Sequence, residues 1–168
     1  MPNFIKAYVR VVEKLGWFIG LFAMYLVFAM LAILLYSSFT KAFTIPAAWT
    51  LEMAQFVMTA YFMLGGAYSM QQNAHVRMDV AYTHWSPRTR AIVDSFTILF
   101  LITYLLLLLA GGISSTIYAF EYSEQSYSSW APYMAPIKVV MVFGIALMLL
   151  QAIATFFRDV AAALGKPI

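Results

Sequence analysis

The 168-residue chain contains no cysteine, two histidines and few charges. Without cysteine it can form no disulfide bond, no thiolate zinc site and no iron–sulfur cluster, and it has no cysteine nucleophile. Charged residues make up 10% of the chain, against roughly 25% in an average soluble domain. A water-soluble protein needs more charge to cover its surface, so this composition nearly excludes a soluble enzyme. It also excludes a disordered chain, which has low hydrophobicity and high charge.

Hydrophobic residues make up 64% of the chain and gather in four segments. Each segment is long enough to span a hydrocarbon core of about 30 Å, which takes about 20 helical residues. The segments cover residues 15–38, 47–70, 87–117 and 137–157. A spanning segment must satisfy its backbone polar groups internally, which a helix does. We therefore predict an all-α integral membrane protein, with a single domain over residues 1–168 and four transmembrane helices.

Basic residues are divided unequally between the two flanks of these segments. The flank that holds both termini has eight of the ten, namely Lys6, Arg10, Lys14, Arg77, Arg88, Arg90, Arg158 and Lys166. The other flank has only Lys41 and Lys138. Because cytoplasmic flanks carry the excess of Lys and Arg, we predict that both termini are cytoplasmic. The basic residues are scattered rather than massed on one face, so we expect no nucleic-acid partner. The first segment is too long for a signal-peptide core of about 7–15 residues, so we expect it to be retained.

Glu52 is the carboxylate that lies most clearly within a spanning segment, and Gln55 follows three residues later. Ionisable groups in membrane helices are candidates for function by default. Three interpretations are open: a site for a coupling ion or proton, a charge buried against another subunit, or a first-turn residue near water. In the first turn, the helix dipole would favour the negative charge.

Two loops carry other polar groups. Residues 75–80 alternate, so that His75, Arg77 and Asp79 share one face and apolar residues the other. Nothing fixes a metal-ligand geometry there, and we expect no metal site. Glu121 and Glu124 lie in the loop before the fourth segment, without a nucleophile or an oxyanion donor beside them, so we expect no catalytic site. That loop is either a solvated acidic segment or a docking surface for a periplasmic protein.

Small residues share one face of the first segment. Gly16 and Gly20 are four residues apart and Ala23 follows on the same face. Such a face lets another helix approach closely. We therefore predict that the first segment packs through this face, either within the chain or against a partner.

Several short stretches together resemble one family, the small membrane subunit (DctQ type) of tripartite ATP-independent periplasmic (TRAP) transporters. The resemblance covers about residues 10–160, and its most specific parts are the second segment and the loop after it. The stretches are Trp49–Glu52, Leu64–Met70 with Gly65 and Gly66, His75–Val80, Ser86–Arg90, Ser128–Trp130, Pro136–Lys138, and Gln151.

The resemblance implies a scaffold role. In such systems a periplasmic binding protein captures an organic acid, and a large membrane subunit moves it inward, driven by a sodium gradient. The small subunit holds the large one in the cell membrane of a bacterium or archaeon, surrounded by lipids. Sodium ions are then expected on the large subunit, and no cofactor on this chain. Structural or interfacial roles are implied for Glu52, Gln55, Gly65, Gly66, His75, Arg77, Asp79 and Gln151, and docking of the binding protein for Glu121, Glu124 and Trp130.

Two other functions remain open from the residues alone. One is a self-sufficient small carrier that uses Glu52 as its proton site. No helix is visibly broken at mid-membrane and no inverted repeat is evident, which disfavours a complete carrier. The other is a membrane anchor for a redox complex, which would need axial histidines inside the helices if it held haem, whereas His75 and His84 both lie in a loop.

Overall fold

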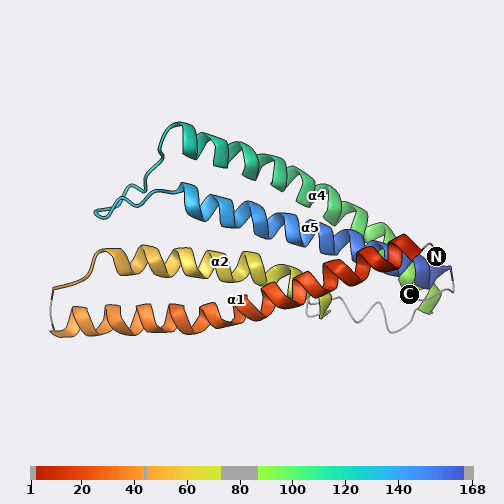
Figure 1. The fold of residues 1–168 in the computed structure, drawn as a ribbon, viewed down its shortest axis with the longest axis horizontal. Coiled ribbons are helices and arrows are strands. Elements are labelled where there is room, and N and C mark those ends of the chain that lie inside the picture. Colours follow the sequence, from red (N-terminus) through yellow and green to blue (C-terminus); the bar gives the residue numbers. More distant parts are fainter. Residues whose placement is uncertain (1–2, 44, 73–86, 165–168) are drawn as a thin grey trace.

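The computed structural model describes residues 3–43, 45–72 and 87–164. The described part contains four helices: α1 (Asn3–Phe43), α2 (Trp49–Gln71), α4 (Pro87–Glu121) and α5 (Ala135–Ala163). Figure 1 shows two antiparallel helix pairs, α1 with α2 and α4 with α5, in contact through α2 and α5. Both termini lie at one end of the bundle, here called the terminal end. The α1–α2 and α4–α5 connections lie at the other, here called the loop end.

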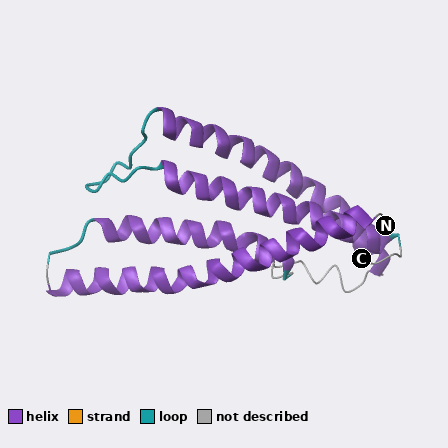
Figure 2. Ribbon diagram, viewed as in Figure 1, coloured by secondary structure: helices purple, strands orange, loops and turns teal. Residues whose placement is uncertain are grey.

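The all-α prediction is confirmed for the residues that the structure describes. Figure 2 shows helices joined by loops, and the pairing of Gln125 with Tyr133 is an isolated bridge rather than a strand. Three of the four helices, α1, α4 and α5, are longer than the apolar segments predicted for them; the first, predicted over 15–38, extends over Asn3–Phe43. The difference arises because hydropathy marks where lipid ends, whereas a helix continues into water until a residue stops it.

Three helices are long and apolar enough to cross a membrane, over Phe4–Phe43, Ile92–Glu121 and Ala135–Ala162. The α2 helix is not among them, although it was predicted as a span. It carries Glu52, Gln55 and two adjacent glycines, which lower its hydropathy. It also packs against both α1 and α5, so less of its surface has to be apolar toward lipid. The four-span topology therefore stays a prediction.

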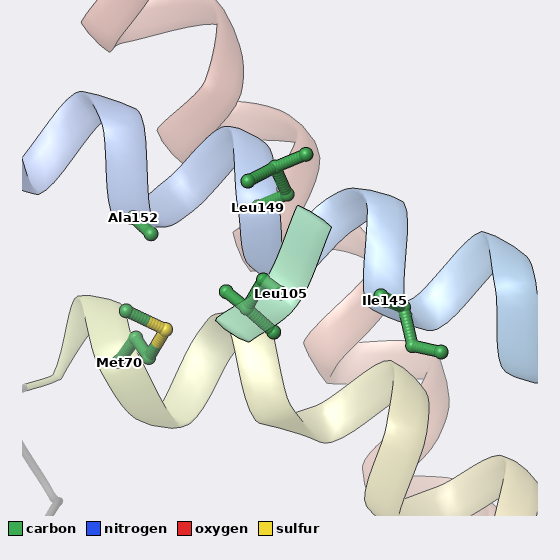
Figure 3. Close-up of a cluster of buried hydrophobic side chains, with 5 residues drawn as sticks. All are labelled: Met70, Leu105, Ile145, Leu149 and Ala152. Carbon is green, nitrogen blue, oxygen red and sulfur yellow. The ribbon is translucent and has the colours of Figure 1, made fainter. Parts of the chain in front are cut away.

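The core runs along the line where α2 and α5 meet. One cluster brings Met70 of α2 and Leu105 of α4 against Ile145, Leu149 and Ala152 of α5 (Figure 3). The other two clusters add α1. One joins Ala23 to Leu64, Ala67 and Leu147, and the other joins Val9 and Val12 to Ala154.

Close helix contacts depend on glycine. A Cβ atom on Gly20 would overlap the Tyr68 side chain, and one on Gly66 would lie 2.7 Å from Sδ of Met148. The small-residue face of α1 is thus a packing surface within the chain, against α2. The sequence left open whether this face packs within the chain or against a partner, and the structure shows that it packs within the chain.

Candidate functional site

The connection between α4 and α5, residues 122–134, is a folded loop rather than a loose link. The Ser126 N–H donates to the Pro132 carbonyl at 3.0 Å, and the Met134 N–H donates to the Glu124 carbonyl at 2.9 Å. Ser123 and Ala131 have positive φ angles of 47° and 45°, which turn the chain tightly. The loop therefore holds the Tyr127 side chain fully exposed at its tip.

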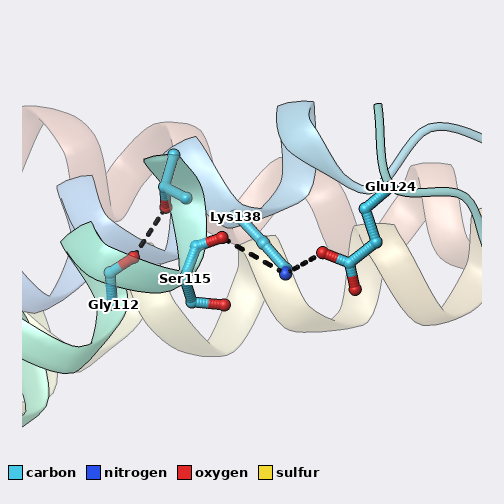
Figure 4. Close-up of polar contacts among 5 residues, drawn as sticks. Gly112, Ser115, Glu124 and Lys138 are labelled. Carbon is cyan, nitrogen blue, oxygen red and sulfur yellow. Dashed lines mark hydrogen bonds and ion pairs between the residues drawn. The ribbon is translucent and has the colours of Figure 1, made fainter. Parts of the chain in front are cut away.

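Lys138, on α5, holds this loop against α4. Its ammonium group forms an ion pair with Glu124 and donates to the Ser115 carbonyl of α4 at 3.4 Å (Figure 4). The ammonium group is largely shielded, with 17% of the side chain exposed. Ion pairing offsets the cost of holding a charge at the edge of an apolar bundle. Glu124, predicted as a docking residue, is thus engaged within the chain.

Glu52 lies in the first turn of α2, beneath the loop 122–134. Its Oε1 accepts a hydrogen bond from the Ser126 hydroxyl at 3.4 Å. Its Oε2 is buried and has no hydrogen-bond partner among the described residues. The first-turn position was one of the three interpretations open from the sequence. The structure brings Glu52 to a loop seventy-four residues away in the sequence.

A hydroxyl cluster fixes the corner between α1 and α2. Thr50 is fully buried, and its hydroxyl donates to the Ala47 carbonyl at 2.8 Å and shares a 3.0 Å hydrogen bond with the Ser37 hydroxyl. Sequence reasoning missed this contact. The available signal was a threonine in the first turn of a helix that begins soon after Pro46.

At the terminal end, α1 and α5 are joined by polar contacts. Glu13 forms an ion pair with Arg158, and the Tyr8 hydroxyl donates to the Leu150 carbonyl at 3.1 Å. The Tyr8 ring also meets the Phe157 ring edge-on. These contacts, also missed from the sequence, hold the extended start of α1 against the end of α5.

The remaining candidates are spread over the bundle. Gln55 is exposed on α2, Gly66 packs against Met148, and a Cβ on Gly65 would meet no described atom within 4 Å. Gln151 is buried between helices. Glu121 is exposed at the end of α4, and Trp130 is half-exposed on the loop. His75, Arg77 and Asp79 lie outside the described residues.

Within residues 3–43, 45–72 and 87–164, no group of three His, Asp or Glu side chains could hold a metal ion. The described surface is instead dominated by apolar side chains. The outward faces of α1 and α4 expose large hydrophobic residues along their whole length, among them Phe18, Phe22, Phe28, Leu35, Phe96, Phe100, Leu107 and Ile117. Exposed apolar surface of this extent is typical of contact with lipid or with another subunit.

A family model agrees with this arrangement. The model for the DctQ component of tripartite ATP-independent periplasmic transporters matches residues 30–162. The chain belongs to the DctQ family. The resemblance seen in the sequence is thus confirmed over most of the chain, from the middle of α1 to the end of α5. Searches of curated proteins and of solved structures found no significant match.

DctQ membership makes this chain a small component of a TRAP transporter. DctQ components function with a large membrane subunit and a periplasmic binding protein. The match begins at residue 30, so it leaves out the first part of α1, which holds Glu13, Gly16 and Gly20.

Proposed function

We propose that this DctQ chain is the scaffold subunit of a sodium-gradient-driven importer of an organic acid. The observation that carries the proposal is the family match over residues 30–162. Two features support the scaffold role. The described surface presents long apolar faces on α1 and α4, and the ion pairs Lys138–Glu124 and Arg158–Glu13 tie helices and loops of the chain together. Substrate and sodium ions would bind on the large subunit.

We propose four membrane spans with both termini in the cytoplasm. The α2 helix has 23 residues, which gives a length of about 34 Å, enough for a hydrocarbon core of about 30 Å. Both termini lie at one end of the bundle, as an even number of spans requires. Of the ten basic residues only Lys41 and Lys138 belong to the loop end, and cytoplasmic flanks carry the excess of Lys and Arg.

Reconstitution tests the function directly. Proteoliposomes that hold this chain and its large membrane partner should accumulate a labelled organic acid when the binding protein and an inward sodium gradient are both supplied. Vesicles that hold only this chain, or only the large partner, should show no uptake above that of empty vesicles. Uptake by this chain alone, or full uptake without it, would contradict the scaffold role.

The alternative function, a self-sufficient proton-coupled carrier, depends on Glu52. The observation that favours this alternative is the buried Oε2 atom of Glu52, which has no hydrogen-bond partner among the described residues. We expect Glu52→Gln to retain uptake within about twofold between pH 6 and pH 8, because the amide can still accept from Ser126 and no coupled proton is lost. The measurement is the initial uptake rate in the reconstituted complex. A rate that collapses at every pH, with normal assembly of the complex, would support proton coupling at Glu52 instead.

A further inference from the structure

Two glutamine side chains converge on Gly16 inside the bundle. Gly16 lies on α1, Gln71 is the last residue of α2, and Gln151 lies near the middle of α5. A Cβ atom on Gly16 would lie 3.4 Å from Oε1 of Gln71 and 3.7 Å from Oε1 of Gln151. Three helices therefore meet at one glycine and two amide groups, here called the Gly16 junction.

Three polar atoms of the Gly16 junction, Oε1 of Gln71 and both Oε1 and Nε2 of Gln151, are buried and have no hydrogen-bond partner among the described residues. The Gln151 side chain is 1% exposed, and neither its Oε1 nor its Nε2 has a hydrogen-bond partner among the described residues. The Oε1 of Gln71 is buried and unpaired in the same sense. Buried polar groups in native proteins are nearly always satisfied, and ordered water commonly satisfies those that protein groups do not reach.

The arrangement of the two Oε1 atoms determines which kind of molecule can bind between them. Two carbonyl oxygens face the same space, and two acceptors cannot bond to each other. A molecule that joins them has to supply two donors, and water has two O–H groups. Apart from these two oxygens, a Cβ atom on Gly16 would meet no other side chain of the described residues within 4 Å, so the side of Gly16 that faces them is open.

We propose that the Gly16 junction binds one water molecule, which donates to Oε1 of Gln71 and to Oε1 of Gln151. The bound water links α2 to α5 across the face of α1. Glu13 lies one turn before Gly16 on α1, and Arg158 lies two turns after Gln151 on α5, where the two form an ion pair. The junction and the ion pair together form a polar layer at the terminal end of the core.

This polar layer helps to set the relative position of three helices whose core contacts are apolar. Apolar contacts tolerate a slip of one helix along another, whereas hydrogen bonds to a shared water do not. Gly16 and Glu13 lie before residue 30, where the family match begins. Gln71 and Gln151 lie within the matched range, and the junction does not depend on the proposed transport function.

Gly16→Ala tests the bound water in the full chain, purified in lipid nanodiscs. The distances of 3.4 and 3.7 Å leave room for a methyl group if nothing else is there. If water is bound, the methyl group displaces it and leaves the amide oxygens without a hydrogen-bond partner. We then expect the melting temperature to fall by roughly 4–8 °C.

Gly111→Ala is the matched control, because a Cβ on Gly111 of α4 would meet no described atom within 4 Å. Because alanine is favoured over glycine inside a helix, this substitution should leave the melting temperature unchanged or raise it by up to about 4 °C. If Gly16→Ala is as stable as Gly111→Ala, the proposal is wrong.

A double substitution tests whether the two glutamines share one ligand. Gln71→Leu and Gln151→Leu should each lower the melting temperature, and the double variant should fall about as far as the larger single one, because each single change already breaks the bridge. Shifts that simply add would show two independent side chains and would overturn the proposal.

A structure at a resolution that shows ordered water completes the test. The expected result is a peak about 2.5–3.0 Å from both Oε1 atoms. Direct contact between Nε2 of one glutamine and Oε1 of the other, with no peak, would overturn the proposal, and so would a protein side chain in that space. Melting temperatures that change when sodium is replaced by choline would identify a cation and overturn it as well.

Discussion

Gly144→Leu is expected to push α5 away from α2 and to lower the melting temperature of the chain by roughly 5–10 °C, the effect of severe overpacking in a domain of this size. A Cβ atom on Gly144 would lie 2.7 Å from both Cβ and the carbonyl oxygen of Met63, and 2.8 Å from its carbonyl carbon. Two of these are backbone atoms, which cannot move unless α2 moves as a whole. The change therefore acts on the contact that joins the two helix pairs.

Gly111→Leu is the matched control for this prediction. It makes the same substitution in a long apolar helix, at a position where a Cβ would meet no described atom within 4 Å. We expect a shift below about 2 °C, within the range of surface substitutions. Thermal unfolding followed by circular dichroism measures both variants. Equal shifts for the two variants would mean that the crossing of α2 and α5 is not as close as the structure places it.

The sequence was sufficient to predict the helices but not their contacts. Apolar runs mark the helices, because only a helix satisfies the backbone in lipid, so their number and order follow from composition along the chain. Gly16 and Gly20 could be recognised as a packing face from their spacing. Gly144 could not, because a lone glycine shows its role only when the crossing partner, Met63, is known.

The contacts of the charged residues in the candidate site could likewise not be predicted from the sequence. Glu121 and Glu124 look equivalent in the sequence, three residues apart in one acidic loop. The structure separates them, since Glu124 pairs with Lys138 while Glu121 stays exposed. The first-turn position of Glu52 was one of the alternatives open from its place after Pro46. Its contact with Ser126 depends on how the loop 122–134 folds back over α2, which no local pattern specifies.

Helix length was also underestimated for a physical reason. Glu13 and Lys14 end the apolar run and indicate a membrane boundary, yet neither residue stops a helix. The start of α1 continues because Val9 and Val12 have a buried partner in Ala154 of α5. Tertiary packing thus extends a helix beyond the limit that hydropathy sets.

The second large effect is expected at the tip of the loop 122–134. Tyr127 is fully exposed there and Trp130 is 41% exposed, on a loop whose backbone is fixed by hydrogen bonds and by the Lys138–Glu124 ion pair. Rigid exposed aromatic side chains are the residues that most often dominate protein interfaces. In the proposed topology this loop faces the periplasm, where the binding protein arrives, so the two side chains are suited to dock it.

Replacing both Tyr127 and Trp130 by alanine should therefore raise the binding-protein concentration that gives half-maximal uptake by roughly 30-fold, the equivalent of about 2 kcal/mol for a lost hot spot. Co-purification with the large subunit should not change, because neither side chain belongs to the apolar faces of α1 and α4. Tyr104→Ala, at an exposed position in the middle of α4, is the control and should leave half-saturation within about twofold. If the double variant keeps the native half-saturation while the complex assembles normally, the binding protein does not dock on this loop.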